Sequence, residues 1–179
     1  MGFLLLSGGT AIPAPSKAPE AITEPGHTVT LTAYNAVPEQ TDSDPLMTAS
    51  GAFSNPEVVA ARSVDLAEDL PFGTIIEIDG PNSSQSTCGY NVVAPAIGYR
   101  VIADAMNSRF SERIDILLST KAEYVTVDKG MKNAAQVLGV CKGVTIRVVG
   151  YITIDRIPKT QVELAKIVDE KDSLLALNK

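Results

Sequence analysis

The alternation of apolar and polar residues predicts a chain of short strands with few helices. Apolar residues alternate with polar ones over residues 27–34, which is typical of a half-buried strand. Runs rich in β-branched residues predict further strands over 58–61, 74–78, 99–104 and 112–118, and a long one over 143–154. Because neither a βαβ rhythm nor an internal repeat is visible, the pattern favours a mainly β fold built as a small barrel.

Helical spacing occurs in three places. A short helical turn is predicted over 63–70 and a helix over 129–138 that ends at Gly139, while 81–98 is predicted to be an inserted loop or hairpin. Thr160-Gln161-Val162-Glu163 has the pattern of a capping box, so a C-terminal helix should follow to about residue 176. We expect its apolar stripe to dock on its own domain, with a partner protein as the alternative. The stripe consists of Val162, Leu164, Ala165, Ile167 and Val168.

The N-terminal part differs in composition from the rest. Residues 1–27 contain a short apolar run and then a stretch rich in proline, which predicts the remnant of an export signal followed by an extended linker. A plain floppy terminus is the alternative interpretation. The barrel domain should span 28–154 and a helical tail 155–179. This organisation predicts an extracytoplasmic protein, in the cell envelope or secreted, with membrane anchoring through a missing N-terminal segment left open.

The charge and the residue counts exclude several classes of function. The net charge of -6 and the lack of a basic stripe argue against a nucleic-acid partner. The single histidine, His27, cannot support a multi-histidine metal site. Cys88 and Cys141 lack the spacing of a metal site, and both a disulfide between them and two unpaired thiols stay open. We expect a monomer without cofactor or metal.

Two aspartates interrupt apolar strand patterns. Ile114, Ile116 and Leu118 should share one face of a strand and Asp115 the other, and Asp104 stands apart from its apolar neighbours in the same way. A carboxylate in a short β-run is costly to bury unless it is paired or functional. Since a short polar turn joins the two strands, Asp104 and Asp115 form a candidate site. Arg113 shares the face of Asp115 and would lower its pKa, and the sequence does not decide whether Arg113 pairs with another acid, binds substrate, or leaves the acid role to Asp104.

Several segments, in order, resemble the three-aspartate (3D) domain of bacterial cell-wall proteins. The matching segments, spread over residues 28–150, are Thr32-Ala33-Tyr34, Gln40-Thr41-Asp42, Thr48-Ala49-Ser50-Gly51, Val59-Ala60-Ala61-Arg62-Ser63-Val64-Asp65-Leu66, Leu70-Pro71-Phe72-Gly73-Thr74, Val101-Ile102-Ala103-Asp104-Ala105-Met106-Asn107, Arg113-Ile114-Asp115-Ile116 and Ala135-Gln136-Val137-Leu138-Gly139. This domain is similar to the catalytic part of the membrane-bound lytic transglycosylase A family and of stationary-phase cell-wall proteins.

The resemblance implies a double-psi β-barrel that acts on the glycan strands of peptidoglycan. The implied reaction is non-hydrolytic cleavage between N-acetylmuramic acid and N-acetylglucosamine, which leaves a 1,6-anhydro sugar. The resemblance also implies three catalytic aspartates, with Asp115 as the acid/base and Asp104 and Asp65 in supporting roles. A single catalytic carboxyl suffices for this chemistry, since the substrate's own 6-hydroxyl attacks and the carboxyl that gave a proton takes one back.

Six further residues are candidates for substrate binding: Tyr34, Thr48, Ser50, Gly51, Asn107 and Arg113. Each has a structural alternative, a turn for Thr48, Ser50, Gly51 and Asn107, and core cover for Tyr34. Competing functions are a non-catalytic, expansin-like module that binds wall polysaccharide, a calcium site built from carboxylates, and a carboxyl protease.

Overall fold

The computed structural model describes residues 26–41, 44–126 and 130–177, with side chains described as far as residue 171. The predicted export-signal remnant and linker at 1–27 lie outside the described residues except for Gly26 and His27. His27 already belongs to the first strand.

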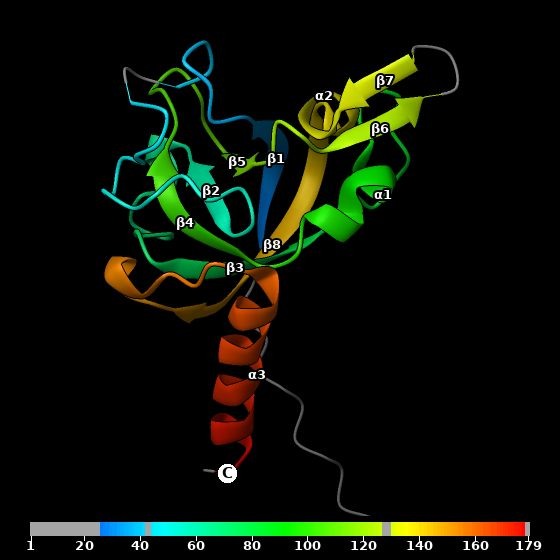
Figure 1. Cartoon of the computed structure of the whole chain (residues 1–179). Helices are drawn as coiled ribbons and strands as arrows, with labels where there is room; N and C mark the ends of the chain where they lie inside the picture. The colour runs from blue at the N-terminus through cyan, green and yellow to red at the C-terminus, as the bar shows by residue number, and fades with distance from the viewer. Residues whose placement is uncertain (1–25, 42–43, 127–129, 178–179) are drawn as a thin grey trace, which may run out of the picture.

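Six strands close into one barrel (Figure 1), which confirms the predicted mainly β fold. The strands are β1 (His27–Tyr34), β2 (Val59–Arg62), β3 (Thr74–Asp79), β4 (Arg100–Ala105), β5 (Arg113–Leu117) and β8 (Cys141–Tyr151). Their order around the barrel is β1-β5-β2-β4-β3-β8. All six lie within two or three residues of the predicted positions.

The barrel has an internal two-fold arrangement. β1 pairs with β5 and β2 with β4 in parallel, while β2–β5, β3–β4, β1–β8 and β3–β8 are antiparallel. Exchanging β1, β2 and β3 for β4, β5 and β8 therefore reproduces every pairing. This is the arrangement expected of a double-psi barrel, and it is visible only in the strand pairing because the sequence shows no repeat.

Apolar side chains from all six strands fill the barrel. Ile114, Ile116 and Leu118 belong to this inner cluster, as the alternation predicted, together with Leu31 of β1 and Ile146 of β8. Leu117 belongs instead to a second cluster, on the outer face of the barrel. Each Å² of apolar surface that is buried stabilises the fold by about 25 cal/mol, so this inner cluster is a main source of the free energy of folding.

The helix α3 (Gln161–Leu177) docks on its own domain through its first turns. Leu164 and Val168 are buried in the outer cluster, while the rest of the helix projects away from the barrel (Figure 1). The predicted capping box forms, because Glu163 Oε2 accepts the Thr160 N–H at 3.2 Å and Glu163 N–H donates to Thr160 Oγ1 at 3.3 Å. Val162 was wrongly placed in the buried stripe, since it is 66% exposed.

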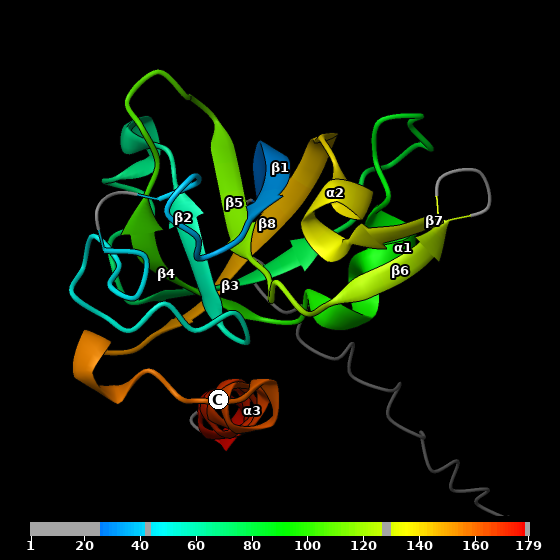
Figure 2. The ribbon, with the colours of Figure 1, turned by 45° about the horizontal axis from the view of Figure 1, so that its top comes forward.

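Two regions differ from the sequence prediction. The segment 81–98 contains α1 (Tyr90–Val93) and the 3-10 turn Ala94–Ala96 rather than a hairpin. The predicted helix 129–138 shortens to α2 (Ala134–Leu138), because Asn133 caps its start by accepting the Ala135 N–H, and Gly139 ends it. The residues before it form a hairpin, β6 (Glu123–Thr126) with β7 (Gly130–Asn133), beside α2 (Figure 2).

The predicted turn over 63–70 is the 3-10 turn Val64–Leu66, and a further 3-10 turn spans Ile154–Arg156. Cys88 and Cys141 form a disulfide with a Cα–Cα distance of 4.7 Å, which decides between the two alternatives for the cysteines. It fastens the helical segment 81–98 to β8.

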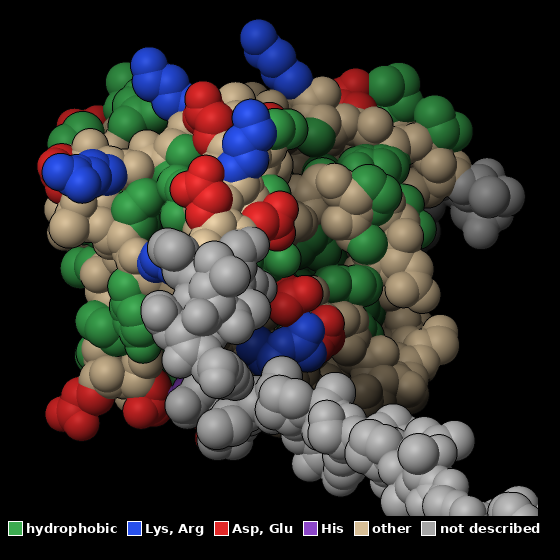
Figure 3. Space-filling view, turned by 90° about the horizontal axis from the view of Figure 1, so that it is seen from below, with side chains coloured by type: hydrophobic (Ala, Val, Ile, Leu, Met, Phe, Trp, Pro, Cys, Tyr) green, Lys and Arg blue, Asp and Glu red, His purple; other side chains and the backbone are tan. Residues whose placement is uncertain are grey.

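The surface carries charges of both signs. On the face from which α3 projects, acidic and basic side chains are interspersed among apolar ones (Figure 3). Within residues 26–41, 44–126 and 130–177, no helix is both long and apolar enough to cross a membrane.

Candidate functional site

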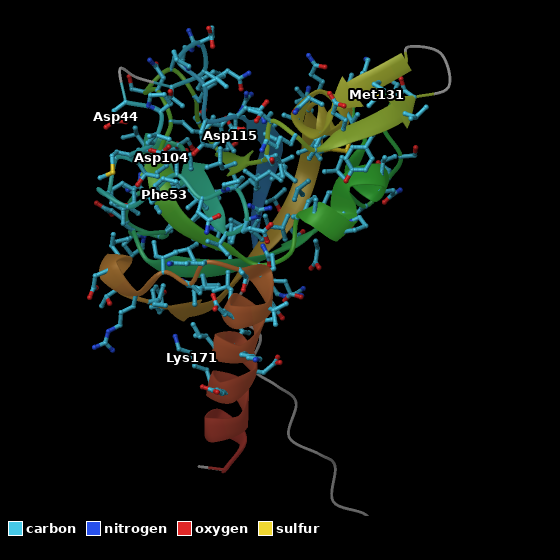
Figure 4. All side chains as sticks on the ribbon, viewed as in Figure 1. Asp44, Phe53, Asp104, Asp115, Met131 and Lys171 are labelled. Atoms are coloured by element: carbon cyan, nitrogen blue, oxygen red, sulfur yellow. A yellow bond between two sulfur atoms is a disulfide. The ribbon has the colours of Figure 1, made fainter. Side chains whose placement is uncertain are left out.

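Asp104 and Asp115 flank the same residue of strand β2. Ala61 pairs with Asp104 of β4 on one side and with Asp115 of β5 on the other. Both aspartates lie on one side of the barrel, away from the hairpin that carries Met131 (Figure 4). With strands spaced about 4.8 Å apart, their Cα atoms are roughly 10 Å from each other across a single methyl group.

A β-bulge brings Asp104 to this position. Ala60 pairs with Ile102, but Ala61 pairs with Asp104, so Ala103 is skipped in the register. Without the shift, Ala103 would lie opposite Ala61. Bulges re-aim side chains in this way and are enriched beside active sites.

Asp115 is half-buried on the outer face of β5. The pKa of Asp115 is raised to about 6, chiefly by burial and also by the charge of Asp104, against the lowering effects of the Thr32 hydroxyl and the charge of Arg113. Thr32 Oγ1 donates to Asp115 Oδ1 at 2.9 Å from the neighbouring position on β1. A pKa of about 6 leaves a fraction of Asp115 protonated near neutral pH.

Asp104 accepts three hydrogen bonds. Its Oδ1 accepts the backbone N–H groups of Ala49 and Ala105, each at 2.9 Å, and its Oδ2 accepts the Tyr34 hydroxyl at 2.9 Å. Burial, followed by the charge of Asp104, raises the pKa of Tyr34 far above its usual value, so the phenol remains a donor. These are the bonds that a carboxylate makes, and they fix its orientation.

Both aspartates open into a cleft of about 510 Å³, here called the acid cleft. Its floor comes from the strands, with Tyr34, Ala61, Asp104, Ala105 and Asp115, and its walls come from two loops. The wall residues are Glu39, Gln40, Thr41, Met47, Ala49, Met106, Asn107, Arg109 and Phe110. The volume is that of an ordinary ligand site.

The structure brings some predicted binding residues into the acid cleft and leaves others out. Tyr34 and Asn107 line it, and Asn107 also makes the predicted turn, since its Oδ1 accepts the Arg109 N–H at 3.1 Å. Thr48, Ser50 and Gly51 form a turn outside the lining: Thr48 Oγ1 bonds Ser50 Oγ at 3.1 Å, and Gly51 has a φ of 82°. The contribution of this tetrapeptide to the site is the backbone N–H of Ala49 on Asp104.

Arg113 is not among the residues that line the acid cleft. Its guanidinium stacks on the Phe110 ring, 4.7 Å from the centroid, and its Nε is buried without a hydrogen-bond partner. Its charge lowers the pKa of Asp115, as the sequence predicted, but burial outweighs this effect.

Asp65 also lies outside the lining of the acid cleft, on an exposed 3-10 turn. Its Oδ2 accepts the backbone N–H of Glu112 at 2.8 Å. The hydrogen bonds from Ser63 and then from Glu112 lower its pKa. The three predicted aspartates thus form one pair, Asp104 and Asp115, and one separate residue that fastens the loop between β4 and β5.

Sequence reasoning missed Arg109, Phe110, Met47 and Glu39 as cleft residues. The signal available was their position in polar loops that begin where β1 and β4 end, but loop sequence does not say which side chains turn inward. Asp44 caps its loop by accepting the Leu46 N–H at 3.1 Å, while Asp42 lies outside the described residues. In the described part of the chain, no three His, Cys, Asp or Glu side chains gather as a metal site.

Comparison with known proteins adds no assignment, because no protein-family model and no curated protein matches the chain.

Proposed function

We propose that this protein is a lytic transglycosylase of peptidoglycan, in the group of three-aspartate domain proteins. The observation that carries the proposal is the half-buried Asp115, whose pKa is raised to about 6, beside a fixed carboxylate in an open cleft. Cleaving a glycosidic bond needs a proton for the leaving oxygen, and a carboxyl with a raised pKa supplies one near neutral pH.

Asp115 is the proton donor and acceptor in this mechanism. It gives its proton to the glycosidic oxygen of the bond between N-acetylmuramic acid and N-acetylglucosamine, and the C1–O bond breaks. The 6-hydroxyl of the same muramic acid attacks C1, and its proton returns to the Asp115 carboxylate. A new C1–O6 bond closes the anhydro ring, no water is consumed, and Asp115 regains its starting state.

Asp104 supports this cycle without transferring a proton. As a carboxylate held by Ala49, Ala105 and Tyr34, it stabilises the positive charge that develops on the sugar ring. Its negative charge also raises the pKa of Asp115. Tyr34 orients Asp104 through its hydroxyl, in addition to lining the cleft as a candidate for substrate binding.

The disulfide supports an extracytoplasmic location, which this function requires. Disulfides persist in oxidising compartments such as the cell envelope and are rare in the cytosol. A non-catalytic, expansin-like binding module is the alternative function, and it would need the cleft but not the raised pKa of Asp115.

Mass spectrometry of purified peptidoglycan after incubation with the protein tests the proposal. We expect anhydro-muropeptides from the unaltered protein and from Asp69→Asn, a matched control at an exposed position, and none from Asp115→Asn. Products with reducing ends would indicate a hydrolase instead. Binding to the wall without any release of products would indicate the binding module.

A further inference from the structure

Arg109 is a cation in a cleft whose other charged residues are acidic. It lines the acid cleft together with Glu39, Asp104 and Asp115, and its side chain is exposed. Within the described parts of the chain, its guanidinium has no carboxylate partner at ion-pair distance, since the ion pairs found there join Arg147 to Glu77 and Asp79. Its charge is therefore available to a ligand.

Phe110 holds this guanidinium in place. Arg109 stacks on the Phe110 ring, 4.8 Å from the centroid, and Phe110 itself lines the cleft. Arg113 contacts the same ring, at 4.7 Å, from outside the cleft lining. A guanidinium stacked on an aromatic ring keeps its N–H donors at its edge, where they can bind a carboxylate in bidentate fashion.

The two arginines that contact the Phe110 ring, Arg109 and Arg113, therefore have different roles. Arg113, which adjoins Asp115 on β5, is the one that lowers the pKa of Asp115. Arg109 sits two residues beyond Asn107 in the loop, on the wall of the acid cleft. Its place on the wall suits a group that projects from the sugar rather than the reacting bond on the floor.

We infer that Arg109 binds a carboxylate carried by the muramic acid residue and so selects peptidoglycan over neutral glycans, an inference that rests on the proposed function. Muramic acid differs from glucosamine by a lactyl ether. Two sources of the carboxylate exist, the lactyl group itself when it carries no peptide and the acidic residues of the stem peptide when it does. Both offer Arg109 the same bidentate acceptor.

The test measures kcat/KM on three soluble glycans: strands that bear stem peptides, the same strands after an amidase has removed the peptides, and chitin oligosaccharides, which have no acidic group. The unaltered protein should prefer one or both acidic glycans over chitin oligosaccharides. In Arg109→Gln this preference ratio should fall about tenfold, because a charge-assisted hydrogen bond is lost. The glycan whose rate falls most identifies the source of the carboxylate.

Arg156→Gln is the matched control, because Arg156 is exposed on the 3-10 turn Ile154–Arg156, outside the lining of the acid cleft. Its preference ratio should equal that of the unaltered protein. If Arg109→Gln slows all three glycans by the same factor, the inference about Arg109 fails while the transglycosylase proposal stands. If the unaltered protein cleaves none of the three, the proposed function itself fails.

Discussion

The carboxylate of Asp65 holds the backbone of Glu112 by accepting its N–H at 2.8 Å. Among the described residues, Glu112 is the one non-glycine with a positive φ, 48°. Such a conformation costs energy and persists only where its surroundings impose it. Asp65 is therefore a positioning residue for the loop that carries Arg109 and Phe110 rather than a member of the acid pair.

Replacing Asp65 by alanine should raise KM for peptidoglycan glycans roughly three- to tenfold, through loss of the loop conformation. Adding Glu112→Gly should restore KM, because glycine adopts a positive φ without strain. Steady-state kinetics of the single and double variants make the comparison. If Asp65 took part in proton transfer, kcat would fall in both variants and glycine would restore nothing.

The pH dependence of the reaction should follow Asp115. Because the proposed mechanism needs this carboxyl protonated and its pKa is raised to about 6, kcat/KM should fall about tenfold per pH unit above 6. Measuring kcat/KM on soluble glycan strands between pH 4.5 and about 8.5 would show this fall. A constant kcat/KM across pH 6–8 would contradict the role of Asp115 as proton donor.

Asp115 should also make the protein less stable as the pH rises. Its pKa is 3.8 in the unfolded chain and about 6 in the fold, so the unfolded state releases the proton first, and stability falls between these two values and then levels off. At about 1.4 kcal/mol per pKa unit, the loss is on the order of 3 kcal/mol.

Asp115→Asn should therefore raise the free energy of unfolding at pH 7.5 by about 2 kcal/mol and change it little at pH 3.5. Urea unfolding at the two pH values measures the difference, with Asp69→Asn as the control for the loss of an exposed charge. Equal effects at both pH values would mean that burial of the Asp115 charge is not the cause.

The methyl group of Ala61 should be the largest side chain that the floor of the acid cleft accepts. Ala61→Val places two extra methyl groups between Asp104 and Asp115, while valine suits a strand. We expect at least a tenfold loss of kcat/KM and a stability change of about 1–2 kcal/mol, measured by kinetics and thermal unfolding. Undiminished activity would show that the sugar does not reach the floor between the aspartates.

The disulfide should support stability rather than catalysis. It joins residues 53 positions apart, so Cys88→Ser/Cys141→Ser should lose about 2–4 kcal/mol in the free energy of unfolding. Neither cysteine lines the acid cleft, and kcat/KM below the melting temperature should stay unchanged. A parallel loss of activity in the folded double variant would show that the helical segment 81–98 also shapes the cleft.

Strand periodicity explains which parts of this fold were predictable. The inward Ile114 and Ile116 and the outward Asp115 follow from a side-chain period of two, so the sequence alone places them correctly. Two features depend on contacts between distant parts of the chain, and the local sequence does not predict them. These are the bulge that skips Ala103 and the hydrogen bond from the Ala49 N–H to Asp104. The β6–β7 hairpin was missed for a similar reason. The predicted helix 129–138 included residues that pair as strand β7, whereas the helix itself begins only after Asn133.

The two symmetry-related halves of the barrel contribute different kinds of side chain to the floor of the acid cleft. The row across the floor reads Thr32, Asp115, Ala61 and Asp104, and the exchange of β1 and β2 for β4 and β5 converts Thr32 into Asp104 and Ala61 into Asp115. One half of the chain thus donates a hydroxyl and a methyl group where the other donates two carboxylates. The first half of the barrel therefore supplies the small uncharged side chains of the floor, and the second half supplies both of its acidic side chains.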